Sequence, residues 1–154
     1  MSSSVGLRLK QLVLLFGAVF LGVVALTNLV NLVSAATTDW TFLNSHNTGY
    51  VESVVAVYDA PGWLDEVVVL GALAIEATGA VLFVRALLRY RGAGTGAVEA
   101  YQALAWNIGV WVAFIVGSEV FLAYDAEGTF RELLALALLM TVAVAVVPDE
   151  VAAA

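Results

Sequence analysis

LVLLFGAVFLGVVALTNLVNLV, residues 12–33, contains no charged side chain and only three polar ones. About 20 apolar residues are enough for a helix to cross the hydrocarbon core of a bilayer. The stretch therefore predicts a transmembrane helix. Similar apolar runs follow, and together they predict four spanning helices at about 12–33, 67–88, 101–124 and 130–147.

The composition of the whole chain agrees with this prediction. Of its 154 residues, 62% are hydrophobic and 12% are charged, and the mean hydropathy is +0.98. Soluble domains are closer to 45–50% apolar and about 25% charged. The runs are too long for barrel strands and lack their alternation, so helices are the expected spanning elements. We expect an all-α, multi-pass protein of the cell membrane in which residues 1–154 form a single four-helix bundle in contact with the lipid bilayer.

The basic residues predict the orientation of this bundle. Five of the six fall on one side of it: Arg8, Lys10, Arg85, Arg89 and Arg91. Only Arg131 falls on the other side. Basic residues favour the cytoplasmic side, so we expect both termini to be cytoplasmic and the long loop between the first two helices, residues 34–62, to lie outside. The net charge of −7 leaves no basic patch for a nucleic-acid partner, and the acid-rich, lysine-poor composition suggests a salt-loving host.

The N-terminal pattern allows an alternative interpretation. Arg8 and Lys10, the apolar run, and VSAA at 33–36 resemble a secretory signal with a small-residue cleavage site. The apolar run continues past Leu26, which is longer than the usual core of such a signal. This length favours a helix that is retained.

Glu76 interrupts the second run, LGALAIEATGAVLFV (70–84), roughly 13 Å from the start of the predicted helix at 67, at 1.5 Å per residue. Ala72, Gly79 and Ala80 surround it at helical spacing and would let a neighbouring helix approach closely. We therefore expect Glu76 to face protein rather than lipid. It is either an uncharged acid hydrogen-bonded to a carbonyl or an asparagine, or a proton-relay or ion-coordinating group.

Glu119 lies in IVGSEVFLAYD (115–125), near the outer end of the third run. Arg131 opens the fourth helix at the same depth, and Asn28 and Asn31 lie three residues apart near the outer end of the first. We expect these four residues to converge beneath the outer loop that carries His46. Such a polar cluster is either a static clasp or a site for a small ligand or ion.

The third helix also carries small residues at every fourth position: Ala105, Gly109, Ala113 and Gly117. This spacing predicts a close helix–helix contact. His46 is the only histidine, so a metal site shared with Glu119 has little support. The sequence holds no nucleophile–base triad, phosphate loop or HExxH spacing. We expect no bound metal and no cofactor.

The order of several motifs resembles the family of predicted small integral membrane proteins that is grouped as a domain of unknown function. The corresponding residues, across most of the chain, are Asn28, Trp40, Phe42 and His46 in DWTFLNSH, Glu76, Trp111, GSEVF (117–121), Phe130 with Arg131, and Pro148 with Asp149. Ser118, Val120 and Tyr124 depart from the family pattern. The resemblance implies a four-helix membrane fold and brings no established activity.

Three functional hypotheses follow. The leading one is a non-enzymatic interaction or accessory subunit whose small-residue stripes pack in a homo-oligomer or in a larger membrane complex. The second is a transporter-like or ligand- or ion-sensing module that uses Glu76 and Glu119. The third is a metal-dependent membrane enzyme centred on Glu119 and His46.

Overall fold

The structure is a computed structural model that describes residues 5–37, 42–43, 46–92 and 94–149. Within these ranges the elements are α1 (Val5–Thr37), α2 (Asn47–Val55), the 3-10 turn η1 (Ala56–Tyr58), α3 (Leu64–Arg89), α4 (Ala97–Val120) and α5 (Tyr124–Val146). Within the same ranges, α1, α3, α4 and α5 are long and apolar enough to cross a membrane, which confirms the predicted four-helix membrane fold. Trp40 lies outside the described residues.

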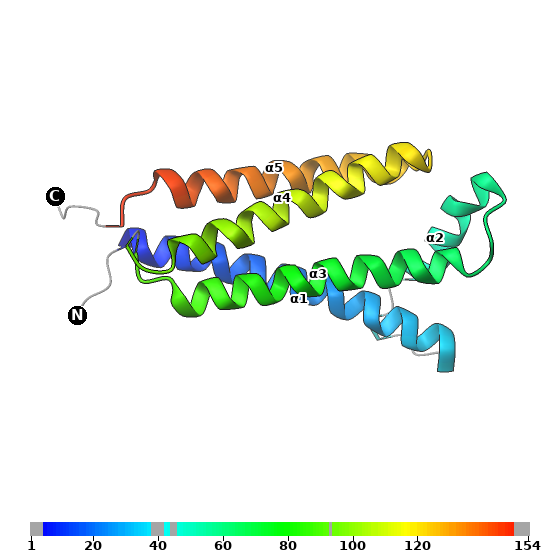
Figure 1. Ribbon diagram of the computed structural model, residues 1–154, viewed down its shortest axis with the longest axis horizontal. Coiled ribbons are helices and arrows are strands. Elements are labelled where there is room, and N and C mark those ends of the chain that lie inside the picture. Colours follow the sequence, from blue (N-terminus) through cyan, green and yellow to red (C-terminus); the bar gives the residue numbers. More distant parts are fainter. Residues whose placement is uncertain (1–4, 38–41, 44–45, 93, 150–154) are drawn as a thin grey trace.

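The four long helices form an elongated bundle of two antiparallel pairs, α1 with α3 and α4 with α5 (Figure 1). The start of α1 and the end of α5 lie at one end of the bundle, which we call the terminal end. Towards the opposite end the pairs fan apart, and α2 lies there; we call this the α2 end (Figure 1). The loop between the first two long helices thus contains α2 and η1.

Two glycines set the close packing of α1 against α3. A Cβ atom on Gly17 of α1 would lie 2.6 Å from a ring carbon of Phe83, which is fully buried. In return, a Cβ atom on Gly79 of α3 would lie 2.6 Å from a methyl group of Leu21 on α1. Each helix therefore provides a gap for a large side chain of the other, as small residues do between helices in membranes.

The connection between α4 and α5 differs from the predicted boundaries. The predicted third helix continues to 124, whereas α4 ends at Val120 and α5 begins at Tyr124 rather than at 130. The turn between them is closed by the Ala123 amide, which donates to the Ser118 carbonyl at 2.8 Å, and Leu122 adopts a φ of 56°. Because the turn residues are apolar, hydropathy does not mark the turn.

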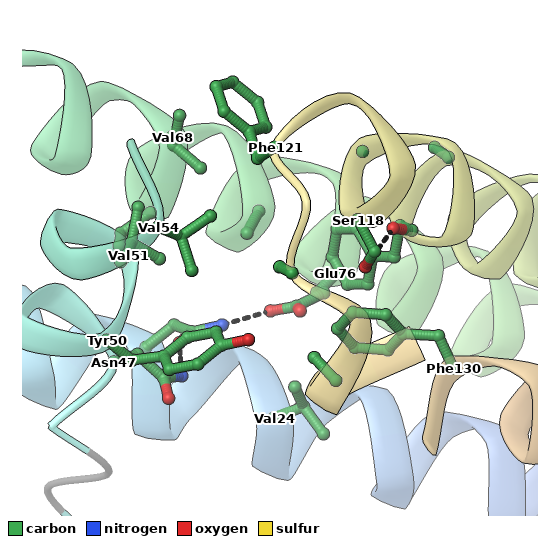
Figure 2. Close-up of a pocket in the computed structure, with 18 of the residues that line it drawn as sticks. Val24, Asn47, Tyr50, Val51, Val54, Val68, Glu76, Ser118, Phe121 and Phe130 are labelled. Carbon is green, nitrogen blue, oxygen red and sulfur yellow. Dashed lines mark hydrogen bonds between the residues drawn. The ribbon is translucent and has the colours of Figure 1, made fainter. Parts of the chain in front are cut away.

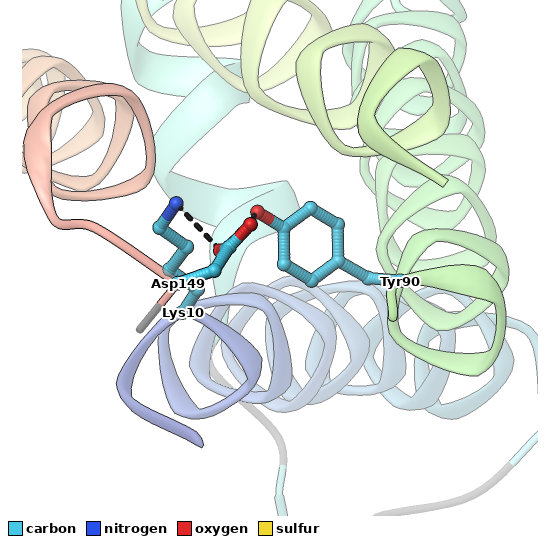
Figure 3. Close-up of polar contacts among 3 residues, drawn as sticks. All are labelled: Lys10, Tyr90 and Asp149. Atoms are coloured by element: carbon cyan, nitrogen blue, oxygen red, sulfur yellow. Dashed lines mark hydrogen bonds and ion pairs between the residues drawn. The ribbon is translucent and has the colours of Figure 1, made fainter. Parts of the chain in front are cut away.

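A polar contact joins three segments at the terminal end (Figure 3). The Lys10 ammonium of α1 donates to Asp149 Oδ1 at 2.9 Å, and the Tyr90 hydroxyl donates to the same oxygen at 3.4 Å. Lys10 is only 5% exposed. Burial raises the pKa of the Tyr90 phenol above its ordinary value, so the hydroxyl stays a donor at neutral pH. The contact ties the segment after α5 to the start of α1 and the end of α3.

Candidate functional site

A cavity of about 460 Å³ lies between the fanned helices at the α2 end. All five helices contribute to its wall, and most of the lining side chains are apolar (Figure 2). The lining includes Phe20 and Val24 of α1, Val51 and Val54 of α2, Val68 and Ala72 of α3, Trp111, Phe114 and Gly117 of α4, and Phe130 and Leu133 of α5. Small-molecule sites in proteins are usually of this kind, with a volume of about 300–1,000 Å³ and a few polar groups.

The polar part of the wall is built around Glu76, whose carboxyl group lies inside the cavity (Figure 2). Glu76 is 2% exposed, and Asn28 of α1 donates from Nδ2 to Glu76 Oε2 at 2.7 Å. Asn47 at the start of α2 donates in turn to Asn28 Oδ1 at 2.5 Å. These bonds form a relay of two amides that ends on the carboxyl group and fixes the Asn28 side chain.

Two tyrosines hold α2 and η1 against the neighbouring helices. The Tyr50 hydroxyl donates to Asp125 Oδ1 of α5 at 3.2 Å, and the Tyr58 hydroxyl donates to the Val120 carbonyl at the end of α4 at 2.6 Å. Burial, together with the charge of Asp125, raises the pKa of Tyr50. The segment from Asn47 to Tyr58 thus covers the α2 end of the cavity.

Aromatic rings form the wall nearest α4 and α5. Trp111 is 3% exposed, and its ring centroid lies 6.1 Å from that of Phe20, 5.6 Å from Phe114 and 6.4 Å from Phe130. The indole N–H donates to Asn107 Oδ1 at 2.9 Å, one turn earlier on α4. This bond pairs the buried Asn107 and fixes the indole, which therefore presents a rigid surface to the cavity.

The expected cluster around Glu119 is not formed among the described residues. Glu119 is exposed, and Arg131 pairs with Glu127 one turn earlier on its own helix. Asn28 bonds Glu76 instead, and Asn31 donates to Thr48 Oγ1 at 2.8 Å. Because α4 ends earlier than expected, Glu119 is its penultimate residue, and the 100° step from the buried Ser118 turns its side chain away from the cavity.

His46 does not lie at the centre of the polar group either. It is exposed and precedes the first turn of α2, with a φ of 54°. Among the described residues, no three His, Cys, Asp or Glu side chains converge as metal ligands would. The geometry therefore gives no support to a metal site made by His46 and Glu119.

The predicted packing stripe on α4 makes no close contact within the described part of the chain, so packing against another molecule stays a prediction. Ala105, Gly109 and Ala113 are exposed, and a Cβ atom on Gly109 would meet nothing within 4 Å. Ala113 and Gly117 line the cavity. Among the described helices, α3 and α5 contact other faces of α4, where Ala103, Leu104 and Val110 are buried.

The small residues around Glu76 on α3 are expected to allow a close approach of another helix, and α1 makes such an approach at one of them. Gly79 makes the close approach to Leu21 described above. Ala72 is half-buried and lines the cavity, and Ala80 is half-buried against the core. Glu76 itself faces protein, as its position among these residues suggests.

Some residues of the site are not identified by sequence reasoning. Asn47 and Tyr50 lie in a loop whose fold the sequence does not determine, and Trp111 is singled out only by the family resemblance and not as a residue of the site. In the comparisons with known proteins, no family model, curated protein or solved structure matches the chain.

Proposed function

We propose that the chain is a multi-pass membrane protein that binds a small, mainly apolar ligand in the cavity at the α2 end, with Glu76 holding the polar group of that ligand. The observation that carries this proposal is the position of Glu76. The residue is only 2% exposed, yet it forms part of the wall of a 460 Å³ cavity instead of being enclosed by side chains.

The chemistry of the wall supports this function. Ionisable groups at membrane depth are costly and are kept mainly where they serve a function. A static clasp would bury the acid against protein on all sides, whereas here Val24, Phe130 and the α2 valines leave space in front of it (Figure 2). Ligand pockets in helix bundles combine such apolar walls with few polar anchors.

Gly117→Leu tests the proposal by filling the cavity from α4. Gly117 lines the cavity and has nothing within 4 Å of the position of a Cβ atom, so a larger side chain can start from there without a clash at its first atom. Gly71→Leu is the matched control, because Gly71 is exposed on α3, equally uncrowded and outside the cavity wall.

The probes are 3-phenylpropan-1-ol and 3-phenylpropan-1-amine, added to protein in lipid nanodiscs and followed by ligand-observed NMR. We expect saturable binding of at least one probe, reduced roughly tenfold or more by Gly117→Leu and unchanged by Gly71→Leu. If neither probe binds above the level of the Gly117→Leu variant, the cavity is not a ligand site and the proposal fails.

The exposed stripe on α4 favours a second candidate, an interaction or accessory subunit. Ala105 and Gly109 offer a flat surface on which another helix could pack closely. Under this hypothesis Gly109→Leu abolishes self-association or complex formation in mild detergent, whereas Gly71→Leu leaves it unchanged. A wild-type protein that is monomeric and captures no partner from native membranes contradicts it.

We also propose that the chain belongs to the family of small integral membrane proteins that it resembles, and that it lies in the cell membrane with both termini inside. The order of motifs and the distribution of basic residues support these statements.

A further inference from the structure

One oxygen of the Glu76 carboxyl group is satisfied by the protein and the other is not. Oε2 accepts from Asn28, while Oε1 has no partner among the described residues. Glu76 is 2% exposed and lines the cavity, so a donor that enters the cavity can reach Oε1. An unpaired acceptor in apolar surroundings is costly, and it is relieved by a donor that enters the cavity.

The charges around the cavity select the sign of that donor. None of the lining residues is Lys, Arg or His. Arg131 near the start of α5 is paired with Glu127, and Tyr50 in the wall is hydrogen-bonded to Asp125. The remaining charges at this end are acidic, with Asp65 and Glu66 opening α3. The local field therefore attracts cations and repels anions.

The aromatic rings of the wall also favour a cationic ligand. Phe20, Trp111, Phe114 and Phe130 are in contact with one another and all line the cavity. Faces of aromatic rings attract organic cations, Trp most strongly, and the interaction strengthens where water is excluded. The same rings offer an apolar surface for the body of a ligand.

We propose that the cavity binds a lipophilic organic monocation: an amine whose ammonium group donates to Glu76 Oε1 and whose apolar body packs against the rings around Trp111. This inference rests on the proposed function, because it names the class of ligand for the same cavity. It explains why an acid without a basic partner is kept at membrane depth.

The test compares the two probes named above, which have nearly the same size and shape. At neutral pH 3-phenylpropan-1-amine is a cation, whereas 3-phenylpropan-1-ol is neutral. We expect the amine to bind roughly tenfold more tightly than the alcohol in the unaltered protein, a difference of about 1.4 kcal/mol. In Glu76→Gln we expect the two affinities to become nearly equal, because the amide keeps the shape of the side chain and loses the charge.

Glu119→Gln is the matched control, since it removes an acid from the exposed face of α4 and should leave the preference for the amine intact. If Glu76→Gln does not fold, the unaltered protein still decides the question through the ratio of its affinities for the amine and the alcohol. Loss of binding in Gly117→Leu then shows that this ratio belongs to the cavity.

The outcomes separate this inference from the proposed function. Equal binding of amine and alcohol, both lost in Gly117→Leu, keeps the ligand cavity and overturns the cation. A preference for the amine that persists in Glu76→Gln also overturns it. Absence of binding by both probes removes the proposed function and this inference together.

Discussion

At the scale of single residues, the effect of substituting a glycine depends on the atoms that a new side chain would contact. Gly17 faces the rigid ring of a fully buried Phe83. Gly22, little more than one turn further along α1, has nothing within 4 Å of its missing Cβ atom. Two glycines of one helix therefore have opposite roles, one as a packing requirement and the other as a replaceable residue.

Gly17→Ala should destabilise the fold by roughly 1–3 kcal/mol, because the new methyl group meets ring carbons that cannot move aside. The measurement is unfolding by a strong detergent, followed by circular dichroism. Gly22→Ala serves as the control and should be neutral or slightly stabilising, since alanine is favoured over glycine inside a helix. Equal losses for both variants would show that the Gly17–Phe83 contact is not the close packing described here.

At the scale of elements, α2 and η1 are held by tertiary contacts more than by their own length. A helix of nine residues is marginal in isolation. Tyr50 bonds Asp125 on α5, and Tyr58 bonds the last carbonyl of α4. Because the segment covers the cavity, we expect these two hydroxyl groups to affect how readily the α2 end opens.

The double variant Tyr50→Phe, Tyr58→Phe should loosen this cover while leaving the four long helices unchanged. We expect faster amide hydrogen exchange in α2 and faster release of a bound probe, because two bonds worth about 1 kcal/mol each are lost. Tyr124→Phe, on the exposed surface of α5, is the control and should change neither rate. Unchanged exchange in the double variant would mean that the apolar contacts of Val51, Val54 and Val55 hold α2 by themselves.

The elements also show how far the sequence determines the structure. The four spanning helices are readable from hydropathy, because length and apolarity suffice for that prediction. The end of α4 cannot be read from hydropathy, since Phe121 and Leu122 are as apolar as the helix before them. Glu119 lies outside the expected cluster because it is on the exposed face of α4, one residue past the buried Ser118. The pairing of Asn28 with Glu76 depends on the crossing of α1 and α3, which spacing along one helix cannot give.

At the scale of the whole molecule, the two helix pairs are joined at the terminal end by the contact between Lys10 and Asp149. The Lys10 side chain is 6% exposed and that of Asp149 is 25% exposed. An ion pair of this kind contributes little when both partners are replaced together, but removal of one partner leaves a buried charge.

Asp149→Asn should therefore lower the free energy of unfolding by about 2 kcal/mol, below the roughly 3–5 kcal/mol typical of fully buried pairs, because Asp149 is partly exposed. Lys10→Met combined with Asp149→Leu should recover most of that loss. The measurement is the same detergent unfolding as for Gly17→Ala. A double variant that is less stable than Asp149→Asn would show that the charges themselves are required.

The predicted orientation is open to a direct test, because the chain contains no cysteine. Glu52 is exposed on α2, at one end of the bundle. Thr95 is exposed in the connection between α3 and α4. We expect Glu52→Cys to react with a membrane-impermeant maleimide in intact cells, and Thr95→Cys to react only after permeabilisation. The reverse pattern would place both termini outside.

The separation of Lys10 and Asp149 along the chain has a consequence for biosynthesis. The two residues are 139 positions apart. At 5–20 residues per second, a ribosome adds the aspartate roughly 7–28 seconds after the lysine. During this interval α1 can already pair with α3, but the lysine at its start lacks its acidic partner. The ammonium group must then remain in contact with water or lipid headgroups, so the contact at the terminal end closes only after the last helix has been inserted.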